Sequence, residues 1–317
     1  MSIQKRISNS AFILKAMAIF SVICAHCPYD TDSVLSCVLN NLGVIGVPIF
    51  FFLSGFFYRT KKYDFKELLI KKLKTLILPW FFCGIVVYLY VAVRKGGDLL
   101  AMANFLIGNG SFLYYMPVVF LFYVIFYFIK DNRGLIIIMA LVSLIWMVVQ
   151  GVYSPLVDFV YPYLNPLNWM LYFSFGIYVQ YYANVEKAIL LIEKFKWVLI
   201  AAGGVTFILL AAINYKLSYW NILFPAVECI CFLGMLALSF EKWMGNKLIL
   251  DIGKESFAIY LLHMPIVGIT NLLLVHYVIY CIRPFFILAI IYFCVKLYVF
   301  ICDKMKCAWL KNFIGAR

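Results

Sequence analysis

The stretch AFILKAMAIFSVICAHC, residues Ala11–Cys27, decides the fold of this chain because it is apolar enough to enter a membrane. It also carries two ionisable residues, Lys15 and His26. A helix turns ~100° and rises ~1.5 Å per residue, so these side chains fall on one helix face roughly 16 Å apart. Ionisable groups inside a membrane segment are costly and usually face the protein interior, which makes both residues functional candidates. Two simpler interpretations stay open: Lys15 snorkels to the cytoplasmic surface, and His26 caps the outer end.

The composition extends this conclusion to the whole chain. Of the 317 residues, 66% are hydrophobic and 13% are charged, whereas a soluble domain averages about 45–50% apolar and ~25% charged residues. We therefore predict an all-α, polytopic membrane protein that forms a single domain over residues 1–317. The first hydrophobic segment carries Lys15 and is not followed by a small-residue cleavage site, so we expect a retained span and not a signal peptide.

The number and direction of the spans follow from hydropathy and basic residues. A span requires ~20 mostly apolar residues. This rule predicts about ten helices, at residues 11–27, 34–58, 68–93, 112–129, 134–151, 166–182, 197–213, 219–240, 255–275 and 284–302. With the N-terminus in the cytoplasm, the cytoplasmic segments hold 21 of the 27 Lys and Arg residues and the outer loops hold four. Cytoplasmic loops favour basic residues, so both termini are expected inside, and the net charge of +13 needs no nucleic-acid partner.

The densest basic segment is YRTKKYDFKELLIKKLK, residues Tyr58–Lys74. Within it Lys71 and Lys74 lie one helical turn apart at the inner mouth of the third span. Membrane topology and attraction to anionic lipid headgroups explain such a segment without further function. The alternative is a landing site for a polyanionic cytoplasmic cofactor.

A second polar pattern lies late in the chain, in GKESFAIYLLHMP, residues Gly253–Pro265. Ser256 and His263 are seven residues apart and share a helix face, with Tyr260 beside them. The hydroxyl groups can satisfy a buried histidine, so a packing role and a catalytic role both remain open for His263.

Glu228 is a buried carboxylate near the middle of the eighth predicted span. Such a group needs a cation or a proton. Lys15, Lys296 and the two histidines are its possible partners, and the sequence does not choose among them.

The ten cysteines lie mostly inside hydrophobic segments, where a free thiol behaves as a small apolar residue. Cys24 and Cys27 form a CxxC pair, but no second pair or histidine cluster accompanies them. A zinc site would need further ligands, so no metal is expected.

Taken together, these stretches resemble the acyltransferase-3 family of integral membrane acyltransferases. Four motifs carry the resemblance in the right order: a basic residue and a histidine separated by ten residues (Lys15 and His26), GVPIFFFLSGF (Gly46–Phe56), a basic pair before a proline (Lys71, Lys74 and Pro79), and SFAIYLLH (Ser256–His263). Two positions depart from the family pattern: Lys15 stands where arginine is commoner, and Tyr114 where tryptophan is usual.

The resemblance implies O-acylation, usually O-acetylation, of a carbohydrate. An acyl group would pass from cytoplasmic acetyl-CoA to a hydroxyl of a cell-surface, exported or lipid-linked sugar, within the lipids of a bacterial inner membrane. His26 would act as general base or acyl carrier. Lys15 would face the acyl donor, and His263 or Glu228 would orient a partner or relay a proton. The basic residues expected to contact acyl-CoA are Arg59, Lys71 and Lys74.

The alternative function is a transporter or flippase for a lipid-linked sugar or polysaccharide precursor. A basic inner face and buried Lys, Glu and His residues suit that class as well. Transporters often contain a matching pair of interrupted helices, which the sequence does not indicate. The sequence also lacks a glycine-rich phosphate loop, a GxSxG motif and an HExxH motif.

Overall fold

The protein is helical throughout the part of the chain that its structure describes. The structure is a computed structural model, which describes residues 3–29, 33–58, 64–152, 161–273 and 280–316, and these residues contain helices but no β-strand. Eight helical segments are long and apolar enough to cross a membrane. The prediction of an all-α, polytopic membrane protein is confirmed.

The eight long segments contain ten helices, because two of them are interrupted. They are α1 (Ile3–Ala25), α2 (Val34–Gly43) with α3 (Gly46–Phe56), α4 (Phe65–Lys72) with α5 (Leu78–Lys95), α7 (Tyr115–Ile129), α8 (Arg133–Val152), α10 (Val185–Ala212), α12 (Lys247–Leu273) and α13 (Arg283–Lys304). Three shorter helices are α6 (Leu99–Ile107), α9 (Met170–Tyr182) and α11 (Phe224–Ser239). The predicted spans 166–182 and 219–240 correspond to α9, with 13 residues, and α11, with 16 residues, so both helices are shorter than a full span.

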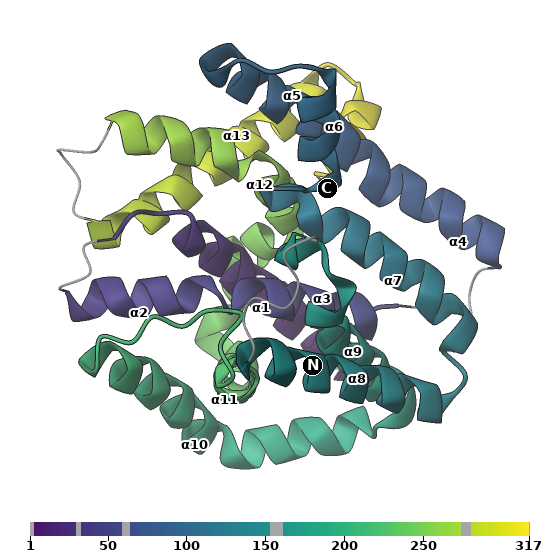
Figure 1. Ribbon diagram of the computed structural model, residues 1–317, viewed down its shortest axis with the longest axis vertical. Coiled ribbons are helices and arrows are strands. Elements are labelled where there is room, and N and C mark those ends of the chain that lie inside the picture. Colours follow the sequence, from purple (N-terminus) through teal and green to yellow (C-terminus); the bar gives the residue numbers. More distant parts are fainter. Residues whose placement is uncertain (1–2, 30–32, 59–63, 153–160, 274–279, 317) are drawn as a thin grey trace.

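Helix α1 lies at the centre of the bundle, while α10 lies at its edge (Figure 1). α1 packs against α2, α3, α11, α12 and α13. It begins before the predicted span and ends at Ala25, so His26 follows the last helical residue instead of lying inside the helix. The buried alanines Ala11, Ala16 and Ala18 are small, which lets neighbouring helices come close to α1.

Helix α12 packs against α1 and runs parallel to it. Near the start of both helices, Gly253 sits on the carbonyl oxygen of Phe12, and a Cβ atom added at this glycine would clash with the Phe12 backbone. Further along both helices, the ring of His263 lies beside that of His26. Two helices that meet at both points run in the same direction, as the predicted topology requires for the first and ninth spans.

The second predicted span, 34–58, is broken where it passes α1. Helix α2 ends at Gly43 and α3 begins at Gly46, so the expectation of one continuous helix is wrong. The hydroxyl of Ser21 donates to the Leu42 carbonyl oxygen at 2.6 Å. In a bilayer core, backbone groups freed by a break need partners within the protein, and Ser21 supplies one. A Cβ at Gly46 would meet the Ala18 carbonyl oxygen, so this position requires glycine.

A second interruption lies in the basic segment. Residues Leu73–Ile77 form a π-helical turn between α4 and α5, directly before Pro79. Proline has no backbone N–H to donate to the preceding turn, and the wider π-helical turn fits this missing hydrogen bond.

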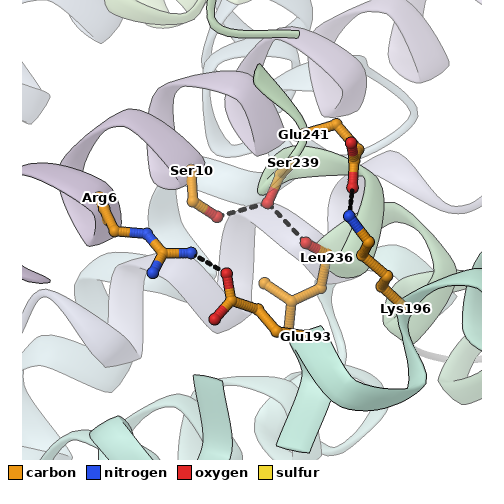
Figure 2. A network of polar contacts seen from close by, with 7 residues as sticks. All are labelled: Arg6, Ser10, Glu193, Lys196, Leu236, Ser239 and Glu241. Atoms are coloured by element: carbon orange, nitrogen blue, oxygen red, sulfur yellow. Dashed lines mark hydrogen bonds and ion pairs between the residues drawn. The ribbon is translucent and has the colours of Figure 1, made fainter. Parts of the chain in front are cut away.

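A network of polar contacts ties the first half of α1 to α10 and to the end of α11 (Figure 2). Its contacts are an ion pair of Arg6 with Glu193, a hydrogen bond between Ser10 and Ser239, a bond from Ser239 to the Leu236 carbonyl at 2.7 Å, and an ion pair of Lys196 with Glu241 at 2.6 Å. In the predicted orientation this network lies at the cytoplasmic end of the bundle.

The α1–α12 contact makes a first testable prediction. We expect Gly253→Ala to lower the melting temperature of the detergent-purified protein by several degrees, because the added methyl overpacks the Phe12 backbone at a cost of about 1–3 kcal/mol. The matched control is Gly204→Ala in α10, where nothing lies within 4 Å of an added Cβ. Equal melting temperatures for the two variants would contradict the close approach.

Candidate active site

A cavity of about 390 Å³ opens between α1, α3, α7, α12 and the α4–α5 interruption, and lysines dominate its charge. The lysines that line it are Lys15, Lys71, Lys72, Lys74 and Lys254. None of its lining residues within the described part of the chain is an aspartate or glutamate. Like charges that share one concave surface produce a strong positive potential, which favours a polyanionic ligand. We call this the lysine cavity.

The lysines reach the cavity from three parts of the chain. Lys15 comes from the middle of α1, where its Nζ lies 5.7 Å and 5.9 Å from the ring centroids of Phe12 and Phe57. Lys72, in the last turn of α4, places its Nζ 3.5 Å from the centroid of the Tyr123 ring. Such cation–π contacts hold an ammonium group in position without neutralising it.

Hydroxyl groups line the cavity as well. Ser54 of α3 and Tyr115 of α7 share a hydrogen bond of 2.8 Å between their hydroxyl oxygens. The ring of Tyr115 lies 5.7 Å from the ring of Tyr260. Tyr260 is anchored in turn, because its hydroxyl donates to the Phe112 carbonyl oxygen. Together these groups form a polar wall with fixed donors and acceptors.

Two histidines meet beyond Tyr260. The ring centroids of His26 and His263 are 5.1 Å apart, and the Phe112 ring stands edge-on to His263 at 5.0 Å. His263 is completely buried, whereas His26 is half-buried. Ser256, Tyr260 and His263 are spaced four and three residues apart on α12, so they share one face of that helix. This row leads from the lysine cavity to the histidine pair.

The hydrogen bonding of His263 fixes its tautomer. Its Nδ1 atom lies 2.5 Å from the backbone carbonyl oxygen of Tyr260. A carbonyl oxygen only accepts, so Nδ1 carries the proton and Nε2 of the neutral ring keeps its lone pair. The Nε2 atom is buried and has no hydrogen-bond partner among the described residues. A proton acceptor is therefore held in the interior of the protein, next to His26.

Most of the residues singled out from the sequence fall at these two places. Lys15, Lys71 and Lys74 line the lysine cavity, while His26 and His263 form the pair. Arg59 lies outside the described residues. Lys15 lies within α1 and His26 directly follows its last residue, so this one helix leads from the cavity to the histidine pair.

Glu228 lies elsewhere. It is buried in α11, near the phenols of Tyr172 and Tyr219, and it is absent from the lining of the lysine cavity. Within the described ranges it forms no ion pair. The structure gives Glu228 none of the cationic partners considered from the sequence, and it does not bring this residue to the histidine pair.

Lys296, one of those considered partners, has other neighbours. Its Nζ lies 2.9 Å from a carboxylate oxygen of Asp251 and 3.6 Å from one of Glu255. Both acidic residues are in the first turns of α12. This cluster neutralises a charge on α13 and fastens α13 to the helix that carries His263.

Four residues that line the cavity were not among the candidate site residues predicted from the sequence: Lys72, Lys254, Ser54 and Tyr115. Lys254 stands only two positions before Ser256, and Tyr115 lies in an apolar run. Tyr114, its neighbour, stacks on Trp169 at 5.7 Å instead of lining the cavity. Only the α3–α7 contact reveals the Ser54–Tyr115 bond.

No metal-binding arrangement is visible in the parts of the chain that the structure describes. No three His, Cys, Asp or Glu side chains in those parts gather in a group that could hold a metal ion. The Cys24 and Cys27 side chains are free thiols and are buried.

The fold and this site define a multi-pass membrane protein with a lysine-lined cavity and a close pair of histidines. A family model described as an acyltransferase domain matches residues 12–302, which is nearly the whole chain. The chain therefore belongs to the acyltransferase-3 family, as the four motifs indicated, and it is a membrane acyltransferase. No curated protein and no solved structure matches it.

The Lys296 cluster makes a second testable prediction. Glu255 is 1% exposed, so Lys296→Met leaves a buried carboxylate without this cation. Breaking a fully buried pair costs about 3–5 kcal/mol, and we expect about 2 kcal/mol here because the Lys296 side chain is 36% exposed. The measurement is the melting temperature in detergent, with Lys304→Met in the same helix as the control.

Double variants then identify the partner of Lys296. Adding Glu255→Gln to Lys296→Met should restore much of the lost stability, because it removes the buried carboxylate charge that has lost its contact with Lys296. Adding Glu228→Gln should not. Rescue by Glu228→Gln alone would show that the pairing described here is wrong.

Proposed function

We propose that this acyltransferase transfers an acetyl group from cytoplasmic acetyl-CoA to a hydroxyl of a cell-surface or exported carbohydrate, in the inner membrane of a bacterium. The observation that carries the proposal is the row of Ser256, Tyr260 and His263, which joins the lysine cavity to the histidine pair. In the predicted orientation the cavity faces the cytoplasm and His26 lies toward the outside. Donor and acceptor can then approach from opposite sides of the membrane.

The lysine cavity suits the donor. Acyl-CoA carries several phosphate charges, and lysine binds phosphate as a compact point charge. The lysines at 71, 74 and 254 are exposed and line the cavity, so we assign the phosphates to them. The cavity volume of about 390 Å³ is within the range of small-molecule sites, about 300–1,000 Å³. The thioester end of the donor would then extend toward Tyr115 and Tyr260.

The histidine pair suits proton transfer. A sugar hydroxyl is a poor nucleophile near neutral pH, and a positioned histidine is the usual general base. His26 takes the proton of the hydroxyl as the new C–O ester bond forms and the C–S thioester bond breaks. The electron pair leaves on the CoA sulfur, which is protonated on release. In the variant of this mechanism with an acyl-enzyme, His26 carries the acetyl group first.

His263 has a supporting role in this mechanism. Its Nδ1–H is committed to the Tyr260 carbonyl, and its Nε2 lone pair is free to accept a hydrogen bond or proton. This residue therefore positions the reacting His26 and receives its proton. Glu228 has no part in the proposed reaction, because it lies outside the cavity lining.

Histidine substitutions test the chemistry. We expect His26→Ala to lose about 10²–10⁴-fold in the rate of acetyl transfer, which is the usual contribution of a general base. His263→Asn keeps a donor for the Tyr260 carbonyl and removes only the second nitrogen, so we expect a smaller loss of about tenfold. The measurement follows radiolabel from acetyl-CoA into envelope glycan in membranes with matched protein levels. A wild-type rate of transfer for His26→Ala would show that His26 is not the general base.

Lysine substitutions test donor binding. We expect the double variant Lys71→Gln and Lys74→Gln to raise the KM for acetyl-CoA about tenfold and to flatten its dependence on salt, because two phosphate partners are lost. The maximal rate should change little. Lys66→Gln is the control, since this exposed lysine lies in the same basic segment but does not line the cavity. Equal effects of both changes would point to general surface charge instead of a donor site.

A further inference from the structure

A second cavity, of about 150 Å³, lies next to the residue that follows His26. It is formed by the start of the α1–α2 connection, the first two turns of α2 and the α10–α11 connection. Cys27 is part of its wall, together with the polar residues Tyr29, Ser36, Asn40, Asn214 and Lys216. It shares no lining residue with the lysine cavity. We call it the outer cavity, because the predicted topology places it on the outer face.

The walls of the outer cavity are held in place by a buried asparagine. Asn41, fully buried in α2, donates from Nδ2 to the Tyr215 carbonyl at 2.8 Å and accepts from the Leu217 backbone N–H at 2.8 Å. These two hydrogen bonds hold the backbone on both sides of Lys216 in place. The α10–α11 connection is therefore fixed to α2, and the position of Lys216 follows from it.

Three polar side chains in the lining are not engaged by any residue that the structure describes. Asn40, Asn214 and Lys216 form no hydrogen bond or ion pair with their side chains in the described part of the chain. Asn41, directly beside Asn40, uses both ends of its amide. The adjacent pair thus divides into one structural asparagine and one that faces the cavity. No acidic side chain lines the cavity within the described ranges.

The chemistry of these groups selects a class of ligand. An amide both donates and accepts hydrogen bonds, which matches the hydroxyls of a sugar. A lysine adds a preference for a negative charge. At ~30 Å³ per water, the cavity holds the equivalent of about five waters, which is the size of a single sugar ring.

We propose that the outer cavity binds the acceptor and that the acceptor is an anionic carbohydrate. Its carboxylate or phosphate pairs with Lys216, its hydroxyls bond to Asn40 and Asn214, and a neighbouring hydroxyl is presented to His26. This inference rests on the proposed function and adds the substrate class and the residues that recognise it.

The test measures acetyl transfer in membranes from labelled acetyl-CoA to three preparations of envelope glycan from the native host. One preparation is untreated, one has its carboxylates reduced, and one has its phosphates removed with hydrofluoric acid. The wild type is compared with Lys216→Gln and Lys216→Arg. Lys187→Gln is the matched control, because this exposed lysine lies at the opposite end of α10.

We expect Lys216→Gln to raise the KM for untreated glycan about tenfold, because a charge-assisted contact is lost. The KM for acetyl-CoA should stay unchanged, and Lys216→Arg should retain most of the affinity. The treatment that removes the recognised anion should bring the wild type to the KM of Lys216→Gln. Carboxylate and phosphate are distinguished by which treatment has this effect.

A variant at Asn40 gives an independent readout. Asn40→Asp places a negative charge in the cavity, so it should weaken transfer to the untreated glycan more than to the preparation without the recognised anion. Folding of each variant is checked by size-exclusion chromatography in detergent. A uniform loss on all three preparations would overturn the inference.

Two outcomes separate this inference from the proposed function. If label enters glycan but Lys216→Gln has the wild-type KM for every preparation, the acceptor site is wrong and the acetyltransferase function stands. If the wild type transfers label to no preparation while it retains acetyl-CoA binding, both the proposed acceptor class and the outer cavity assignment fail.

Discussion

The contact on which the site depends is the close parallel packing of α12 on α1. Gly253 lets the α12 backbone rest on the Phe12 carbonyl, and a larger residue would push the helices apart. Because the helices then run side by side, Ser256, Tyr260 and His263 of α12 lie beside the chain from Lys15 to His26. This registration brings His263 to within ring contact of His26. It also places Ser256 and Tyr260 in the wall of the lysine cavity.

The break between α2 and α3 also shapes the two cavities. Inside a continuous helix over 34–58 the backbone groups would bond to one another. At the break between Gly43 and Gly46 the Ser21 hydroxyl instead donates a hydrogen bond to the Leu42 carbonyl oxygen. The break separates α2, which forms the outer cavity, from α3, which forms the lysine cavity. One hydrophobic segment thereby contributes walls to two sites at different depths.

Much of the site could be predicted from spacing along single helices. The face shared by Ser256 and His263 follows from helical geometry alone, whereas His26 lies just past the end of the helix that carries Lys15. The partners of buried charges could not be predicted in this way. Lys296 pairs with Asp251 and Glu255 because α13 lies against α12, and nothing in the local sequence shows which helices are neighbours. The same holds for the Ser54–Tyr115 bond and for the position of Glu228 outside the lining of the lysine cavity.

By itself, the sequence determined that this protein is a helical membrane protein, because the hydrophobic segments are long enough to require a bilayer. It also determined the family, because motifs are ordered along the chain. Only the tertiary structure decided that two distant histidines form a pair, that five lysines share one cavity, and that Cys27, the residue after His26, lines a second cavity. Helix packing in a membrane depends on small residues and close backbone contacts between distant segments, and such contacts leave no periodic signal in the sequence.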